Sequence, residues 1–227
     1  MSILDRLNQV NDVPVYDCRD EAFRPYGIIH EGFDVKEAVE WMKANGPMPE
    51  KGNMYLPSVK GLEDLKLKKD LVTKIYGGMP VQMGLCDGYN TTYNGFEFHK
   101  GSEINIAVTG FMLVLAHVWQ IRDCKIDVSD AKVFYVPEGT VLEMFETTLH
   151  LSPCRISDEG FKDIVVLPEG TNLPLTEEEK AALDRNDPWQ KLLLARNKWV
   201  LSHPQREPLM KQGAWPGLTG ENKELFY

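Results

Sequence analysis

The feature that most constrains the fold is a succession of short β-type segments between Val81 and Leu167. Glycine, asparagine, aspartate and proline separate these segments, and no stretch with helical periodicity interrupts them. Many short strands at such spacing are typical of antiparallel sandwiches and barrels. The sequence therefore predicts an all-β core built from VQMGLCDG, TTYNGFEFH, EINIAVTG, MLVLAHVWQI, KVFYVPEG, TTLHLSP and KDIVVLPEG.

The segments on either side of this core have helical signals. Asp34 can cap a helix that ends at Gly46, and Thr176 with Glu179 forms a capping box for another. The run from Pro188 to His203 is interpreted as a further helix that starts at a proline and ends before Pro204. We expect a single domain with an N-terminal helical arm (1–80), a barrel core (81–170) and a C-terminal helical tail (171–227).

Composition and charge exclude several classes of protein. Hydrophobic residues make up 43% of the chain, which is enough to bury a substantial core. The net charge of −9 and the absence of a Lys/Arg-rich run argue against a nucleic-acid partner. The longest apolar stretch is too short to span a membrane, and the N-terminus lacks a signal-peptide pattern. We expect a cytoplasmic protein with neither nucleic acid nor membrane as a partner.

The stretch GFEFHKGSEINIAVTG, residues 95–110, carries the strongest chemical signal. Alternate residues of a strand share a face, so Glu97 and His99 point the same way. A tight turn at Gly101 and a new strand from Glu103 would form a hairpin that presents all three polar side chains on one surface. Imidazole and carboxylate ligands suit Mn²⁺, Fe²⁺, Zn²⁺, Co²⁺ or Ni²⁺. The plain alternative is a solvated hairpin with charged residues.

Two motifs resemble those of the cupin superfamily. The run His99-xxx-Glu103-xxxxxx-Gly110 resembles the second half of the first cupin motif, and Pro137-Glu138-Gly139 resembles the PxG turn of the second. This resemblance covers roughly residues 80 to 170 and implies a double-stranded β-helix, or jelly-roll, barrel. More narrowly, the chain resembles bacterial cupin-like proteins of unknown function that accompany sugar-utilisation genes, and more distantly ureidoglycolate lyases and cupin sugar isomerases.

The chain departs from the cupin pattern at two ligand positions. Glu97 stands where the family has its first histidine, and Leu142 stands where the third is expected, with Glu143 beside it. The resemblance then implies the metal ligands Glu97, His99, Glu103 and Glu143. Three carboxylates and one imidazole favour a hard divalent cation such as Mn²⁺ or Mg²⁺, although the identity of the metal stays open.

Glu143, Glu146 and His150, which all follow the PxG turn, are candidate catalytic proton carriers. Glu146 and His150 share a face if their strand is regular, and that face is opposite to the face of Glu143. A bulge could bring both sets inward. The alternatives are a loop acid for Glu143 and a hydrogen-bonded wall residue for His150.

The resemblance and the ligand chemistry together indicate a metal-dependent enzyme whose substrate is a small sugar or sugar acid. Aldose–ketose isomerisation fits best, because it needs a cation that polarises a carbonyl and a base that moves a proton. One alternative is a ureidoglycolate-lyase-like lyase, in which Lys100, Arg122 or Arg155 could neutralise a substrate carboxylate. The other is a non-catalytic sugar-binding cupin. Apolar strand edges predict a homodimer.

Overall fold

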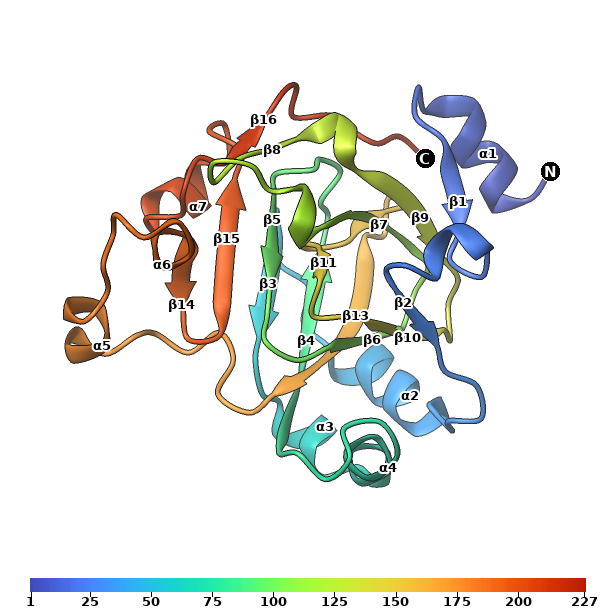
Figure 1. Ribbon diagram of the computed structural model, residues 1–227. Helices are drawn as coiled ribbons and strands as arrows, with labels where there is room; N and C mark the ends of the chain where they lie inside the picture. The colour runs from blue at the N-terminus through green and yellow to red at the C-terminus, as the bar shows by residue number, and fades with distance from the viewer.

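The computed structural model describes residues 1–227 and has the all-β architecture that the sequence predicts. Its two main sheets pack face to face as a jelly-roll β-barrel, with helices on the outside (Figure 1). The larger sheet has six strands in the order β2 (Gly27–Ile29), β10 (Val141–Met144), β6 (Glu103–Ala107), β13 (Phe161–Pro168), β4 (Val81–Gly88) and β3 (Asn53–Leu56).

The second main sheet faces the first across the core. Its strands are β1 (Val15–Asp17), β9 (Lys132–Val136), β7 (Phe111–His117), β11 (Thr148–Leu149) and β12 (Cys154–Arg155). A three-stranded sheet continues the barrel wall with β5 (Gly95–Phe98), β15 (Lys198–Ser202) and β14 (Leu193–Ala195), and a short pair joins β8 (Ile126–Asp127) to β16 (Leu218–Thr219).

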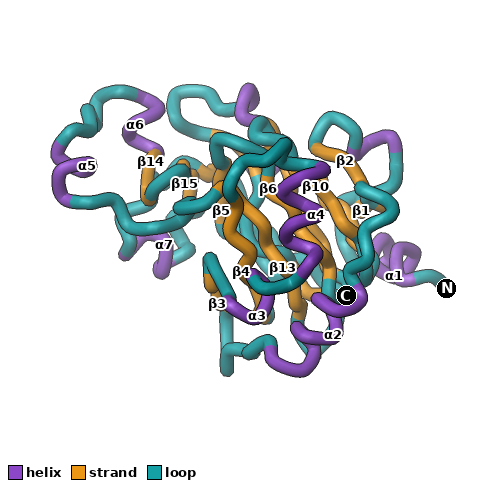
Figure 2. Tube along the Cα trace, turned by 90° about the horizontal axis from the view of Figure 1, so that it is seen from below, coloured by secondary structure: helices purple, strands orange, loops and turns teal.

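Strand alternation in the six-stranded sheet separates a helix-covered face from an inner face. Ile104 and Ile106 of β6 pack outward into a cluster that includes Met42 and Leu71 of the covering helices. Figure 2 shows these helices, α2 (Lys36–Asn45), α3 (Lys60–Glu63) and α4 (Lys66–Lys74), over the sheet. The alternate residues of β6 therefore face the barrel interior.

The helical signals at the two ends are confirmed in part. Helix α2 lies where it was predicted, but its N-cap is Val35, and the Asp34 side chain instead accepts a hydrogen bond from the Lys36 amide at 3.2 Å. The capping box of Thr176 and Glu179 starts helix α5 (Glu177–Ala181) as predicted. The other helices are α1 (Ile3–Val10), α6 (Pro188–Leu192) and α7 (Glu207–Lys211), with 3₁₀ turns at Glu21–Phe23, Val118–Gln120 and Val128–Asp130.

The helix predicted over Pro188–His203 is wrong beyond Leu192. The chain there forms strands β14 and β15, joined by a turn in which Asn197 has φ 55°. Asparagine tolerates this left-handed conformation, and the turn interrupts any helix. Strand β15 then pairs antiparallel with β5, with Val200 opposite Glu97. A partner strand distant in sequence therefore overrides the local helical pattern.

The predicted hairpin between residues 97 and 103 is also wrong. Strand β5 pairs with β15, whereas β6 pairs with β10 and β13, so the two strands belong to different sheets. Gly101, with φ 97°, allows the sharp change of direction between them. Glu97 and Glu103 consequently approach each other across a corner of the barrel.

The first 80 residues do more than cover the core, because they contribute strands. In that region β1 pairs parallel with β9, β2 pairs with β10, and β3 pairs with β4. The division into arm, core and tail stays a prediction. No helix of the chain combines the length and apolar character needed to cross a membrane.

A buried carboxyl on the helix-covered face predicts how stability depends on pH. Burial raises the pKa of Asp87 to about 6, although Lys162 Nζ lies 3.5 Å away. The unfolded-state pKa is about 3.9, so the folded state binds this proton more tightly. The contribution of this proton to the free energy of unfolding is fully present below the unfolded-state pKa and is lost as the pH rises through the folded-state pKa of about 6.

We therefore expect Asp87→Asn to reduce the fall in the free energy of unfolding between pH 4 and pH 7 by about 1–3 kcal/mol. Urea unfolding at a series of pH values measures this fall. Identical slopes in the wild type and the variant would show that Asp87 does not titrate in this range.

Candidate metal centre

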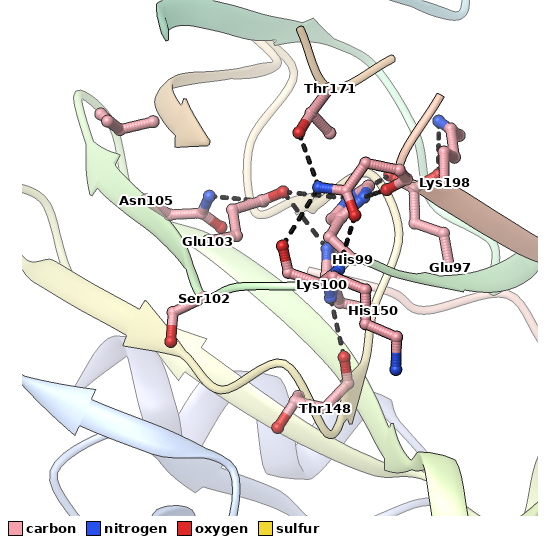
Figure 3. Close-up of polar contacts among 12 residues, drawn as sticks. Glu97, His99, Lys100, Ser102, Glu103, Asn105, Thr148, His150, Thr171 and Lys198 are labelled. Carbon is pink, nitrogen blue, oxygen red and sulfur yellow. Dashed lines mark hydrogen bonds and ion pairs between the residues drawn. The ribbon is translucent and has the colours of Figure 1, made fainter. Parts of the chain in front are cut away.

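Four titratable side chains meet in the interior of the barrel near the ends of three strands. Glu97 belongs to β5, His99 follows it, Glu103 begins β6, and His150 follows β11. Each is less than a tenth exposed, and Figure 3 shows them pointing toward one another. Burying four such groups is costly unless they are paired or bind an ion.

The distances within the cluster are those of a compact ligand set. Ligand atoms of Glu97, His99 and His150 all lie within 4.8 Å of one another. His99 Nε2 is 3.7 Å from Glu97 Oε1 and 3.6 Å from Glu103 Oε2. His150 Nε2 lies 3.3 Å from the same Glu103 oxygen.

Backbone carbonyls fix the tautomers of both imidazoles. His99 Nδ1 is 2.6 Å from the Asn197 carbonyl oxygen, and His150 Nδ1 is 3.0 Å from that of Thr148. A carbonyl can only accept, so each Nδ1 carries a hydrogen and donates it. Each Nε2 is thereby turned toward the carboxylates, and that of His99 is buried without any hydrogen-bond partner.

This hydrogen-bonding pattern fits metal ligation. Histidines that bind metals typically donate their second ring N–H to a carbonyl or carboxylate, which orients the ring. The backbone also fixes the relative positions of two ligands, because Glu97 and His150 exchange N–H···O bonds of 2.6 and 3.0 Å. The unpartnered His99 Nε2 is then a lone pair aimed at the position of a cation.

The charges of the cluster also favour a cation. Burial alone would raise the pKa of Glu97, but Lys198, whose Nζ lies 2.5 Å from Oε2, and the two imidazoles hold it well below its usual range. Burial likewise opposes ionisation of Glu103, yet His150 and His99 lower its pKa. The two carboxylates in turn raise the pKa of His150 against its burial. The centre therefore attracts a positive charge.

Two imidazole nitrogens and two carboxylate groups form the donor set that the structure brings together. Such a mixed set suits Mn²⁺, Fe²⁺, Zn²⁺, Co²⁺ or Ni²⁺. The residues present therefore fit a bound divalent metal.

A cavity of about 130 Å³ opens onto this cluster. Asp163 of β13 lines it, is 1% exposed, and has no hydrogen-bond partner at either carboxyl oxygen. Burial, followed by the negative charges of Glu103 and Asp87, raises the pKa of Asp163 well above its usual range. The lining also includes the polar and charged residues Tyr55, Asn105, Ser152, Asn172, Lys198 and Arg206.

Comparison with protein families identifies a match over residues 15–223, to a family described as a domain of unknown function, DUF4867. This match spans most of the chain. The protein belongs to the DUF4867 family. No curated protein matches this DUF4867 chain.

Two solved structures show distant similarity to the DUF4867 chain. A single-residue variant of oxalate decarboxylase from Bacillus subtilis matches with a TM-score of 0.34 and 12% identity, covering 58% of this chain and 28% of that one. Salicylate 1,2-dioxygenase from Pseudoaminobacter salicylatoxidans, in an adduct with gentisate, matches with a TM-score of 0.31 and 8% identity, covering 58% and 29%. The DUF4867 chain thus spans less than a third of the length of either structure.

The structure does not bring Glu143 into the cluster. In the β10–β6 register Glu143 lies opposite Ile104, on the helix-covered face, and its Oε2 is 2.8 Å from His30 Nε2. Met144 is the residue opposite Glu103. The structure therefore separates Glu143 from the other three residues of the four-ligand set that the resemblance implies, and it places His150 beside them.

Glu146 is likewise outside the cluster. It is exposed, and its carboxylate accepts a hydrogen bond from the Gly101 amide at 3.3 Å. His150 lies inside the cluster, where its ring is a candidate metal ligand and its Nε2 is close to Glu103. Of the three predicted proton carriers, Glu143 and Glu146 do not line the cavity. His150 does line it, but as one of the candidate metal ligands.

The cations expected to neutralise a substrate carboxylate are also elsewhere. Arg122 donates to backbone carbonyls of its own turn, Arg155 lies over two tyrosine rings, and Lys100 lies 5.8 Å from the ring centroid of Trp199. Lys198 and Arg206 line the cavity instead. Lys198 lies within the C-terminal segment interpreted as a helix, and Arg206 lies just after it. The sequence pattern therefore gives no reason to place either residue at the site.

Proposed function

We propose that this DUF4867 protein is a metal-dependent cupin enzyme that converts a small sugar or sugar acid by aldose–ketose isomerisation. The observation that carries the proposal is the buried group Glu97, His99 and His150, with Glu103 adjoining it, at the inner end of a cavity. The jelly-roll barrel is the scaffold that the cupin resemblance implies. The site chemistry, rather than the fold, decides the reaction class.

The four residues of the cluster would hold the metal. A bound divalent cation would supply Lewis acidity, which polarises a carbonyl and its neighbouring hydroxyl. Asn105 donates to Glu103 Oε1 at 2.8 Å and orients that carboxylate. Lys198 fixes Glu97 from the other side of the cluster. These contacts would hold the ligands in place before substrate arrives.

Asp163 is the proposed proton carrier. Isomerisation moves one proton between adjacent carbons, and a general acid–base group works best when its pKa lies near the working pH. Burial and the neighbouring carboxylates raise the pKa of Asp163 well above its usual range, in the direction that this role requires, and the residue lines the cavity with both carboxyl oxygens unpartnered. A carboxyl at this position can take the proton from one carbon and return it to the next.

An NMR assay tests the proposed reaction. We expect the protein loaded with Mn²⁺, Zn²⁺, Co²⁺, Ni²⁺ or Fe²⁺ to interconvert at least one aldose–ketose or uronate pair, and the protein stripped with EDTA to lose that activity. Turnover in D₂O distinguishes the routes, because an enediol incorporates deuterium at carbon 2 and a hydride shift does not. If none of the five metals supports conversion of any of these aldose–ketose or uronate pairs, the proposal is contradicted.

A lyase acting on a ureido or hydroxy acid is the second proposal. The observation that favours it is Arg206, a cation of the cavity lining that could receive a substrate carboxylate. The same spectra would detect it as cleavage into two smaller products. A homodimer and a cytoplasmic location stay predictions.

A further inference from the structure

Arg206 differs from every other arginine of the protein. The chain has eight arginines, and seven of them donate from the guanidinium to an oxygen of the protein. The Arg206 side chain makes no hydrogen bond and no ion pair; only the backbone of this residue is bonded, with its amide donating to the His203 carbonyl and its carbonyl accepting from Leu209 and Met210. Guanidinium groups are rigid forks of five donors that suit carboxylate and phosphate.

The position of Arg206 gives this free guanidinium a use. It lines the inner cavity and also a wider outer pocket of about 430 Å³. The two hollows share six residues, so the outer pocket is the mouth of the inner cavity. The shared residues are Tyr55, Ser152, Asn172, Lys198, Arg206 and Leu209.

The charge of the mouth is opposite to that of the inner end. Glu97, Glu103 and Asp163 line the inner cavity, but no acidic side chain lines the mouth. Lys198 is engaged by Glu97, which leaves Arg206 as the cation without a counter-charge. In a chain with a net charge of −9, an uncompensated cation at the entrance favours anionic ligands.

A second unpartnered group lies on the wall that the two hollows share. Asn172 Oδ1 is buried and has no hydrogen-bond partner, although the residue lines both hollows. An amide oxygen can only accept, so it suits a ligand hydroxyl. An acceptor and a cation that both lack partners and line the same hollows indicate a ligand that supplies both a hydroxyl and an acid group.

We propose that Arg206 is the anion-binding subsite of this pocket and that the substrate is a hydroxylated acid. The acid group binds Arg206 at the mouth, a hydroxyl donates to Asn172, and the hydroxy-carbonyl group reaches the inner end, which Glu97 and His150 line. This inference rests on the proposed function only for that inner end. Carboxylate and phosphate share the chemistry that the guanidinium recognises, and the experiment separates them.

Calorimetric titration with matched probes tests the subsite. D-glucuronate, D-glucose and D-glucose 6-phosphate differ in the acid group and otherwise present similar hydroxyls. A charge-assisted pair should give the wild type a preference of about 10- to 100-fold for an acid over D-glucose. Arg206→Gln should remove that preference and leave D-glucose binding unchanged. The carboxylate and phosphate arms show which acid the subsite prefers.

The matched control is Arg24→Gln, which removes an exposed arginine paired with Glu21 and should keep the full preference. Arg206→Lys keeps the charge but loses the fork, and should retain only part of it. Each titration is run with EDTA and with Mn²⁺. An acid preference that persists in EDTA supports the subsite even if the metal chemistry fails. The proposed subsite would be overturned if the wild type and Arg206→Gln showed the same preference for an acid over D-glucose, or if the wild type showed no such preference.

Discussion

Replacing His99 with alanine should lower the affinity for Mn²⁺ or Zn²⁺ at least about 100-fold and abolish metal-dependent turnover. His99 Nε2 is a buried ring nitrogen without a hydrogen-bond partner in the protein, and its Nδ1 donates to the Asn197 carbonyl. Loss of an outer hydrogen bond to a metal ligand already costs about 10- to 100-fold in affinity, so loss of the ligand itself costs more. Competition with a chromogenic chelator measures the affinity.

Glu143→Gln is the control for this experiment. Glu143 was a metal ligand in the set implied by the cupin resemblance, but it pairs with His30 on the helix-covered face. The variant should therefore keep the affinity of the wild type. Equal affinities in the wild type and His99→Ala would show that any bound metal sits elsewhere. A large loss in Glu143→Gln would restore the four-ligand set implied by the resemblance.

Replacing Asp163 with asparagine should lower turnover by about 10²- to 10⁴-fold while metal affinity stays close to that of the wild type. The asparagine keeps the size of the side chain but has no titratable proton. Because both oxygens of Asp163 lack partners in the protein, the exchange breaks no hydrogen bond. The rate constant and the metal affinity are measured on the same preparation.

Asp87→Asn provides the matched control for Asp163→Asn. Both carboxyls are buried and have raised pKa values, but Asp87 pairs with Lys162 and lines neither the inner cavity nor its mouth. An asparagine oxygen can still accept the hydrogen bond that the Asp163 amide donates to Asp87 at 3.2 Å, so turnover should fall much less in Asp87→Asn than in Asp163→Asn. Equal turnover in Asp163→Asn and the wild type would remove Asp163 from the mechanism and return the proton-transfer role to a residue of the ligand cluster.

Much of the fold could be predicted because its signals are local. The β-type segments of the core are short, alternate in polarity and end at turn residues, so each can be recognised alone. Strand β15 could not be recognised in this way. Its residues fit a helical pattern, and only the turn at Asn197 and the partner strand β5 make it a strand. Propensity yields to such tertiary pairing.

The site divides in the same way between local and distant information. Glu97, His99 and Glu103 are close in sequence, so spacing alone brought them together. Glu143 was misplaced because side chains alternate faces along a strand, and a shift of one residue exchanges interior for exterior. Lys198 belongs to strand β15, about 100 residues after Glu97, and no sequence motif predicts that the two side chains pair.

Anomalous diffraction from crystals grown with Mn²⁺ or Zn²⁺ tests the metal centre most directly. The account predicts one strong peak per chain, about 2.0–2.2 Å from the Nε2 atoms of His99 and His150 and in contact with a Glu97 or Glu103 oxygen. The same crystals of His99→Ala should lack it. A peak at His30 and Glu143 instead, or no peak within the barrel at saturating metal, would contradict the account.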